Sequence, residues 1–418
     1  MCLCLCGSSV WGWVLNSLEK FIPEHEPREN FMAIKRLSLK DFRCYESIQL
    51  ETSALPVILT GPNGAGKTNL LEALSFLAPG RGMRHVKLFE PSRRLRSDEI
   101  GLPARSWAVA AVIENSMGSF NIGTGLVSKE DGEGRRAVRI NGVEGHSQAC
   151  LSERVAILWV TPDMQRLFND GAGGRRRFLD RMIIANDPKH SARLNAYDKV
   201  LRGRARVLSD ARRDNFKPDY EWLNALEVKM VESGMAIVAA RMELVQRLNQ
   251  ACALGIGLFP AARLELAGAV DYWLKDMPAI DAEEKFLASL QRSRDEDSIS
   301  RGAAIGPHKS DLEVEFLARK TPARDCSTGE QKALLLSITI AYARLQTLEK
   351  GFPPILLLDE VIAHLDREHR EGLFEELLSL GAQAWMTGTE CDLFSSLRHS
   401  AQHFTAITWK ASNSSAGR

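Results

Sequence analysis

Short apolar runs and longer stretches of helical periodicity alternate along this chain of 418 residues. The apolar positions between Ile34 and Leu50 predict two strands joined by a turn at 42–45. Four-residue apolar runs at 57–60 and 355–358 are typical of buried strands. Further strands are expected at 107–113, at 136–143 with an Asn141-Gly142 hairpin turn, and at 154–160, 312–316, 384–387 and 404–409. The pattern therefore predicts an α/β fold.

The middle of the chain has the periodicity of long helices. One face is marked by Leu194, Tyr197, Leu201 and Leu208. A second apolar stripe follows: Trp222, Leu226, Met230, Val238, Met242, Val245 and Leu248. We interpret these stripes as the packing seam of a helical arm or hairpin, in preference to a ligand site. Helices are also expected after residue 68 and over 332–348, and residues 281–297 are predicted to form an exposed helix and loop.

These patterns divide the chain into an α/β head with a mainly helical insertion. The predicted head consists of residues 32–170 and 300–410, the inserted lobe of residues 171–299, and a tail of residues 411–418. Residues 1–31 differ from the rest, with an apolar start and three cysteines. A signal peptide, a metal-binding cysteine triplet and a lipid anchor were each considered, but we expect an appendage outside the fold. Met32 is then a candidate functional start.

Composition narrows the class of protein. The chain is 44% hydrophobic and 26% charged with a net charge of +1, so affinity for nucleic acid must come from local basic patches. The eight cysteines include no C-x-x-C pair, which favours a reducing cytoplasm without disulfides or a zinc site. No apolar run approaches the ~20 residues that span a bilayer. We expect a soluble, cytoplasmic protein without a membrane partner.

Two regions concentrate positive charge. Residues 81–96 contain six Lys or Arg side chains against one Glu, and residues 166–217 contain fourteen against six Asp. The first region is either a solvated loop or a loop facing phosphate or DNA. The second is either a solvated face or a nucleic-acid surface. The sequence leaves both alternatives open.

One motif organises the rest of the chain. Residues 61–68 match the phosphate-binding loop G-x-x-x-x-G-K-[ST] between a predicted strand and a predicted helix. Such a loop directs backbone N–H groups and a helix dipole toward a polyphosphate. Lys67 is expected to reach the β- and γ-phosphates, and Thr68 to ligate Mg²⁺. The predicted nucleotide-binding residues are Gly61, Pro62, Asn63, Gly64, Ala65, Gly66, Lys67, Thr68 and Asn69.

Two further motifs fit the same chemistry. Asp359 and Glu360 end a predicted buried strand, so Asp359 is expected to hold Mg²⁺ and Glu360 to polarise the attacking water. Ser327 and Gly329 precede the predicted helix 332–348, where they form either a second anion site or an ordinary helix cap.

Together with Asp366, these motifs resemble the ABC-type ATPases. The details resemble the RecF family of recombinational-repair proteins. That resemblance rests on 35–43, Gly80-Arg81-Gly82-Met83-Arg84, Pro162-Asp163 with 175–180, and Gly306-Pro307-His308, which occur in the family's order. It covers roughly residues 32–410 and implies an ABC-type P-loop ATPase head with a helical second lobe.

The resemblance also implies a mechanism. ATP and Mg²⁺ would be bound between two subunits, and Ser327, Gly329 and Gln331 of one subunit would face the γ-phosphate held by Lys67 of the other. Asp366 would lie in the connecting D-loop. The family binds gapped, single-stranded and duplex DNA, is a weak DNA-stimulated ATPase, and works with RecR and RecO to load RecA. Candidate DNA contacts are Arg81, Arg84, Arg175, Arg176, Arg202 and Arg204.

The chain departs from ABC patterns at several positions. Cys326 and Glu330 replace an aliphatic residue and a glutamine of the signature, and an acid near a partner's phosphates would weaken closure. No glutamine between Leu77 and Trp107 suits a Q-loop, and residues 387–389 lack a histidine. The alternatives are an SMC- or RecN-like ATPase, which has far longer coiled coils, a transporter ATPase, which is more compact, and a small-molecule kinase, which needs neither signature nor basic arm.

Overall fold

The computed structural model describes residues 30–93, 106–127, 134–253 and 255–405. The predicted appendage and tail therefore lie almost wholly outside the described residues. Within these ranges, none of the helices combines the length and apolarity needed to cross a bilayer.

A parallel sheet forms the centre of the head. Its strand order is β14 (Gln402–Thr405), β3 (Val57–Thr60), β13 (Ala384–Gly388), β12 (Ile355–Leu358) and β8 (Ile157–Val160). Strand β13 lies between β3 and β12, and all neighbouring pairs are parallel. The carboxyl ends of β3 and β12, which the sequence marks with its two strongest motifs, consequently lie at one edge of the sheet with β13 between them.

Both faces of this sheet are buried, which explains its apolar strands. In β3, Ile58 packs into one core cluster, while Val57 and Leu59 pack into the other. The same alternation occurs in β12, where Leu356 and Leu357 belong to opposite clusters.

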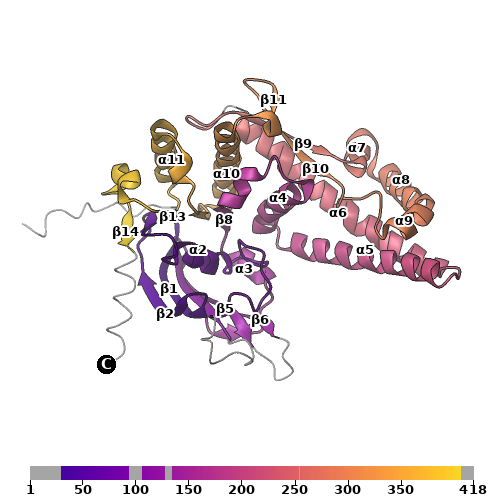
Figure 1. Ribbon diagram of the computed structural model, residues 1–418, viewed down its shortest axis with the longest axis horizontal. Coiled ribbons are helices and arrows are strands. Elements are labelled where there is room, and N and C mark those ends of the chain that lie inside the picture. Colours follow the sequence, from indigo (N-terminus) through magenta and orange to yellow (C-terminus); the bar gives the residue numbers. More distant parts are fainter. Residues whose placement is uncertain (1–29, 94–105, 128–133, 254, 406–418) are drawn as a thin grey trace, which may run out of the picture.

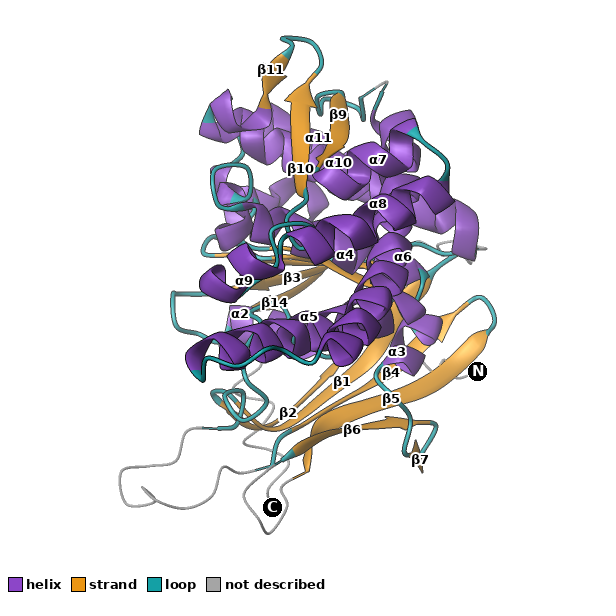
Figure 2. Cartoon of the chain, turned by 90° about the vertical axis from the view of Figure 1, so that its right-hand side faces the viewer, coloured by secondary structure: helices purple, strands orange, loops and turns teal. Residues whose placement is uncertain are grey.

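An antiparallel sheet lies beside the parallel one (Figure 2). Its strand order is β2 (Tyr45–Glu51), β1 (Met32–Phe42), β4 (Ala108–Asn115), β5 (Gly118–Val127), β6 (Arg135–Ile140) and β7 (Val143–Glu144). Helix α2 (Lys67–Ser75) buries Leu70, Leu71 and Leu74 in the core shared by the two sheets. The phosphate-binding loop is therefore anchored between two packed layers.

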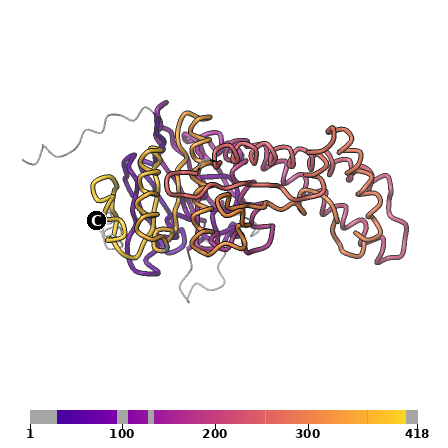
Figure 3. The backbone as a smooth tube through the Cα atoms, turned by 90° about the horizontal axis from the view of Figure 1, so that it is seen from above, coloured from indigo at the N-terminus to yellow at the C-terminus, as the bar shows by residue number. Residues whose placement is uncertain are grey.

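Most of the other helices cover the second face of the parallel sheet or form an arm that projects from the head (Figures 1 and 3). The arm is built on α5 (Lys189–Arg213) and α6 (Tyr220–Cys252), against which α7 (Ala269–Asp276), α8 (Ala279–Arg292) and α9 (Arg294–Ser300) pack. The remaining helices are α3 (Ala149–Arg154), α4 (Ala172–Asn186), α10 (Thr328–Lys350) and α11 (Arg367–Leu380), with short 3₁₀ segments η2 (Pro162–Arg166), η3 (Ala323–Asp325), η4 (Ile362–His364) and η5 (Cys391–Leu397).

A small third sheet joins the arm to the head. Its order is β11 (Thr321–Pro322), β10 (Asp311–Phe316) and β9 (Ala262–Ala267). Strand β9 lies inside the predicted helical insertion, yet it pairs along its whole length with β10 of the head. Helix α4 and the end of α6 also pack into the head core. Packing thus crosses the predicted lobe boundaries, and these stay predictions.

Most of the predicted elements are present. The Phe42–Tyr45 hairpin and the Asn141-Gly142 turn are confirmed, the latter with φ of 50° and 82°. The prediction that 281–297 includes an exposed loop is wrong, because α8 and α9 cover most of it and bury Phe286 and Leu290. The helical stripes are a packing seam, except that Trp222 is 54% exposed. Strands β5 and β9 were not predicted.

Candidate nucleotide and nucleic-acid sites

The phosphate-binding loop leads from β3 into α2. Lys67 is the first residue of the helix, and its Nζ donates hydrogen bonds to the carbonyls of Gly61 and Pro62 at 2.6 and 3.1 Å. The side chain is therefore folded back over the loop, with its charge at the N-terminus of α2. The partial positive charge of the helix N-terminus and the charge of Lys67 therefore lie together, and both favour the binding of an anion.

Gly66 shows why the loop requires glycine. Its φ is +103°, and a Cβ there would lie 2.4 Å from the Tyr45 hydroxyl and 3.0 Å from the Cys44 sulfur. Any side chain would be strained and would collide with the β1–β2 hairpin.

Thr387, at the end of β13, joins the two motifs. Thr68 and Thr387 donate hydrogen bonds to Oδ1 of Asp359, at 3.0 and 2.9 Å. Thr387 Oγ1 also accepts a hydrogen bond from the backbone N–H of Glu360 at 2.8 Å. Burial raises the pKa of Asp359, and the two hydroxyl hydrogen bonds oppose that shift. The strand order, which puts β13 between β3 and β12, positions this hydroxyl.

Glu360 has an unusual backbone. Its φ is +52°, a left-handed conformation that is costly for a residue with a side chain and is common at active sites. Its side chain lines the same pocket as residues 63–69, whose volume is about 210 Å³. The carboxylate is therefore placed beside the region where a terminal phosphate would lie.

Arg84 is a member of this pocket that sequence reasoning assigned elsewhere. It was predicted as a DNA contact, but it lines the nucleotide pocket together with Lys67 and Glu360. Its guanidinium donates to Asn69 Oδ1 at 3.2 Å and to Glu72 Oε2 at 3.0 Å. Glu72 is fully buried and also pairs with Arg43, so it fixes Arg84 at the pocket edge.

The donor set fits Mg²⁺ bound with a nucleotide. The described residues contain no cluster of three or more His, Cys, Asp or Glu side chains that could hold an ion alone. Mg²⁺ beside a triphosphate needs only one or two protein oxygens, because phosphates and water complete its shell. The Thr68 hydroxyl and the Asp359 carboxylate are oxygens of that kind and lie in contact.

Ser327 and Gly329 lie in a different pocket of about 390 Å³, with no lining residue in common with the nucleotide pocket. Ser327 is the N-cap of α10 and forms a capping box with Glu330. Gln331 does not face this pocket: its buried amide donates to the carbonyls of Arg324 and Cys326 at 3.3 and 3.0 Å. It organises the preceding turn, so the predicted contact of Gln331 with a partner's nucleotide is unsupported.

Asp366 connects the two pockets along the chain. It caps α11 by accepting a hydrogen bond from the backbone of His369 at 2.8 Å, and it also contacts the His369 ring. Both residues line the Ser327 pocket. The segment from Glu360 to Asp366 therefore leads from the nucleotide pocket to the pocket that contains Ser327.

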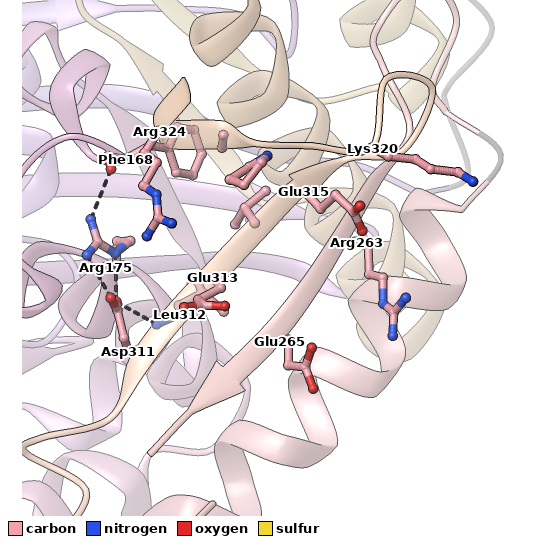
Figure 4. A pocket seen from close by; sticks show the side chains of 13 residues that line it. Phe168, Arg175, Arg263, Glu265, Asp311, Leu312, Glu313, Glu315, Lys320 and Arg324 are labelled. Carbon is pink, nitrogen blue, oxygen red and sulfur yellow. Dashed lines mark hydrogen bonds and ion pairs between the residues drawn. The ribbon is translucent and has the colours of Figure 1, made fainter. Parts of the chain in front are cut away.

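Several of the arginines predicted to contact DNA form ion pairs or hydrogen bonds within the chain. Arg204 is fully buried between Glu227 and Asp297, so the prediction that it contacts DNA is wrong. Arg175 forms a two-pronged pair with Asp311 at 2.7 and 2.8 Å (Figure 4). Arg176 donates to the Ser310 carbonyl at 2.6 Å.

Arg202 is exposed on α5, where it pairs with Asp198. Arg81 is also exposed and lines a large cleft between the head and the arm, with a volume of about 1040 Å³. The other basic residues of this cleft come from both sides: His85, Lys87, Arg177 and Arg181.

Arg181 forms the wall of this cleft. Its guanidinium lies 4.3 Å from the Trp159 ring centroid and donates to the Trp159 carbonyl at 3.2 Å. Burial lowers its pKa to about 9, which leaves it charged at neutral pH. Within the described chain, its Nε has no hydrogen-bond partner. Asp180 is the acidic residue among those lining the cleft, and it is already paired with Arg241.

Sequence comparison places these motifs in a family. Residues 33–406 match the RecF/RecN/SMC N terminal domain. The DNA replication and repair protein RecF of Mesorhizobium japonicum is 43% identical over 374 residues, which cover 89% of this chain and 95% of that protein. RecF of Caulobacter vibrioides is 42% identical, with coverage of 88% and 94%. The chain belongs to the RecF family.

Solved structures have the same fold. A structure of the recombination mediator protein RecF with ATPrS has a TM-score of 0.76 at 22% identity, covering 87% of this chain and 94% of that one. The Smc head domain of Pyrococcus furiosus has a TM-score of 0.50 at 17% identity, with coverage of 90% and 93%. The α/β head with its helical lobe is thus the fold of the RecF and SMC ATPases, and the predicted fold class is confirmed.

The sequence motifs predicted the loop, the two acids and the signature, but they did not predict three features of the site. Thr387 was considered only as the place of a missing histidine. Arg84 was assigned to DNA, although its spacing after α2 brings it back to the loop. Arg177 stands in the motif 175–180 and Arg181 directly follows it. Both differ from Arg175 and Arg176 in helical phase, which could have separated them.

Proposed function

We propose that this protein is an ATP-dependent DNA-binding protein of recombinational repair and replication-gap processing. Two copies would bind two triphosphates at their interface, each held by the loop of one subunit and by Ser327 and Gly329 of the other. The observation that carries this proposal is the separation of the two half-sites. The pocket with Lys67 and Glu360 contains the phosphate-binding loop and the Thr68 hydroxyl that contacts Asp359, whereas the Ser327 pocket has no phosphate-binding loop of its own. ATP and ATPrS in solved RecF structures support this assignment.

Each residue of the nucleotide pocket then has a role. Lys67 would exchange its two carbonyl contacts for phosphate oxygens, and Arg84 would add a second cation. Thr68 and Asp359 would hold Mg²⁺, which neutralises phosphate charge when bound. Glu360 would accept a proton from the attacking water, and Thr387 would keep its backbone in place. Hydrolysis would be slow and DNA-stimulated, and it would open the dimer.

DNA would bind in the cleft between the head and the arm. Arg81, Lys87 and Arg177 present charge from both walls, and the acidic Asp180 is already neutralised. Contacts of this kind recognise phosphates and tolerate any sequence, as expected of a protein that binds gapped, single-stranded and duplex DNA. The predicted contacts through Arg175 and Arg176 are replaced by this set.

Partners and location follow from the same role. RecF occurs with RecO and RecR in the pathway named for the solved relatives, so we expect mediator proteins of those types as partners and RecA loading as the outcome. Since a protein with this role would act on the chromosome, we expect it in the cytoplasm. An SMC- or RecN-like role is less well supported, because the arm ends after one hairpin of 25- and 33-residue helices.

Two variants test the proposal. The Lys67→Arg protein should lose ATP-dependent dimerisation, and the Glu360→Gln protein should remain dimeric on ATP because hydrolysis is slowed. Both are measured by analytical ultracentrifugation and phosphate release, with and without gapped DNA. The proposal is wrong if ATP changes neither the dimer fraction nor the affinity for gapped DNA in the wild-type protein, or if Glu360→Gln turns over ATP normally.

A further inference from the structure

Ser327, the serine of the signature, is fixed by hydrogen bonds to the carboxylate of Glu330. The Glu330 carboxylate Oε2 accepts hydrogen bonds from the Ser327 backbone N–H and from its hydroxyl, both at 2.8 Å. The Glu330 N–H in turn points to Ser327 Oγ at 3.4 Å. The group that would meet a partner's γ-phosphate is therefore already donating to a carboxylate of its own chain.

Arg319 provides the opposing charge. It lies in the turn between β10 and β11, and its guanidinium forms an ion pair with the other carboxylate oxygen of Glu330. The turn is fixed by a hydrogen bond from Arg319 N to the Phe316 carbonyl at 3.2 Å, and the guanidinium lies 5.7 Å from the Phe316 ring centroid. The side chain is 65% exposed, so it stands at the open side of the Ser327 pocket.

The charges around this pocket are few. Its lining includes two acids, Glu330 and Asp366, and two basic side chains, Arg319 and His369. Asp366 contacts His369 and the backbone of α11, so Arg319 is the cation that faces Glu330. The hydrogen bonds from Ser327 lower the pKa of Glu330, and Arg319 adds to that effect, so the carboxylate is ionised at neutral pH.

A triphosphate and an ionised carboxylate repel each other at short range. The repulsion is strongest in a closed interface, where water no longer screens it. Removing the positive charge of Arg319 would leave Glu330 directly opposed to the phosphate that Ser327 is meant to bind. The side chain at position 330 also orders the turn that presents Ser327 and Gly329, through a capping box in which glutamine can take the place of glutamate.

We propose that Arg319 is a positioning residue of the composite ATP site, which offsets the Glu330 carboxylate so that a second copy of this chain can seat its nucleotide against Ser327. Arg319 acts through Glu330, as a charge placed by the β10–β11 turn. This inference rests on the proposed function, and it assigns a role in dimerisation to Arg319, which lies outside the motifs, and to Glu330, a signature position at which the chain departs from the ABC pattern.

The test is a double-mutant cycle on dimerisation. Arg319→Ala, Glu330→Gln and the double variant are titrated with ATPγS and Mg²⁺, and the dimer fraction is followed by analytical ultracentrifugation. Arg319→Ala should need at least about tenfold more nucleotide for half-dimerisation, whereas Glu330→Gln should need no more than the wild type. The double variant should return to within about threefold of Glu330→Gln, because the opposing charge is gone.

Two controls separate this role from a structural one. Binding of a fluorescent ATP analogue at protein concentrations too low for dimerisation should be unchanged in every variant, as should the melting temperature. Arg324→Ala removes a neighbouring exposed arginine that pairs with Asp325 and lies outside the Ser327 pocket, and it should dimerise like the wild type.

The outcomes are distinguishable. If Arg319→Ala dimerises like the wild type, or if the double variant is as impaired as Arg319→Ala, the inference is overturned and the proposed function stands. A wild-type chain that stays monomeric with ATPγS overturns the proposed function and this inference with it. Rescue of Arg319→Ala by Glu330→Gln is the supporting result.

Discussion

Thr387, on β13, contacts both of the acids that follow β12, Asp359 and Glu360, through its single hydroxyl group. It donates to the Asp359 carboxylate and accepts from the Glu360 backbone, which holds Glu360 at a positive φ. Strained backbones of this kind persist only where neighbouring groups fix them. The geometry of the two acids thus depends on Thr387.

Thr387→Val should therefore weaken turnover more than folding. Valine has nearly the shape of threonine but leaves the Glu360 N–H without its acceptor, so we expect about a tenfold loss in ATPase activity, or ~1.4 kcal/mol. Thr387→Ser, which keeps the hydroxyl, is the matched control. Steady-state phosphate release measures both, and equal activity of the valine variant and the wild type would contradict the assignment.

His308 gives the stability of the arm base a pH dependence. Its Nε2 donates to the Ala303 carbonyl at 2.9 Å, and in the neutral ring Nδ1 accepts from the Tyr197 hydroxyl at 2.7 Å. Burial lowers the pKa of His308 in the folded chain. The unfolded chain takes up a proton near pH 6.5, so this contribution to the free energy of unfolding is present above pH 6.5 and is lost as pH falls below it.

Urea unfolding of the wild type and of His308→Gln at pH 7.5 and pH 5.5 checks this prediction. Between these pH values the wild type should lose more unfolding free energy than the variant. Equal losses in both proteins would mean that the ring does not titrate as its contacts require.

At the scale of elements, one arginine fixes the turn that follows α2. Arg136 on β6 donates to the Ala78 carbonyl at 3.0 Å, and also to the carbonyls of Phe76 and Gly80. These three carbonyls follow the last residue of α2, and this guanidinium provides each with a hydrogen-bond donor in the segment that leads to Arg84. A strand of the antiparallel sheet therefore sets the position of a nucleotide-pocket residue.

Arg136→Met should lower the free energy of unfolding by roughly 2–4 kcal/mol, because it leaves the carbonyls of the buried residues Phe76 and Ala78 without this donor. Arg139→Met, on the same strand, removes only an exposed pair with Glu144 and should change stability by less than about 1 kcal/mol. Urea denaturation compares the two. If both variants lose the same small amount, Arg136 does not anchor the turn.

The elements that were predicted correctly share a physical property. Strands β3 and β12 are buried on both faces, so their apolar runs are unambiguous, and the glycines of the loop between β3 and α2 are required by its backbone. Strand β5 was missed because it contains three glycines and alternates weakly. Strand β9 was missed because a helical context surrounds it, and its pairing partner is more than forty residues away.

The same distinction holds for the candidate site. Residues 63–69 of the continuous loop motif line one pocket, whereas the positions of Thr387, Arg84 and the cleft arginines depend on strand order and helical phase. Arg204 was assigned to DNA because its sequence neighbours are basic, but its acidic partners come from α6 and α9. Local charge counts cannot show an ion pair with a distant segment.

On the scale of the whole molecule, the cleft between head and arm should dominate the response of DNA binding to salt. Each phosphate contact adds about one unit to the slope of log affinity against log salt concentration. Arg81→Ala and Arg177→Ala should each reduce that slope by about one unit, in fluorescence anisotropy titrations on gapped DNA.

Arg202→Ala is the comparison, since Arg202 lies on the arm outside this cleft and pairs with Asp198. Its slope should equal that of the wild type. The reverse pattern, with a reduced slope for Arg202→Ala alone, would move the DNA contact from the cleft to the arm.

The pairing of β9 with β10 couples the position of the arm to that of the head. Helix α6 has 33 residues and is therefore about 50 Å long. A tilt of roughly 5° at its base displaces the far end by roughly 4 Å. Strand β9 follows α6 and pairs with β10, which leads through β11 into the first turn of α10. The same tilt would therefore shift Ser327 at the start of α10. A load on the outer end of the arm would thereby reach the surface proposed to receive the second subunit's nucleotide.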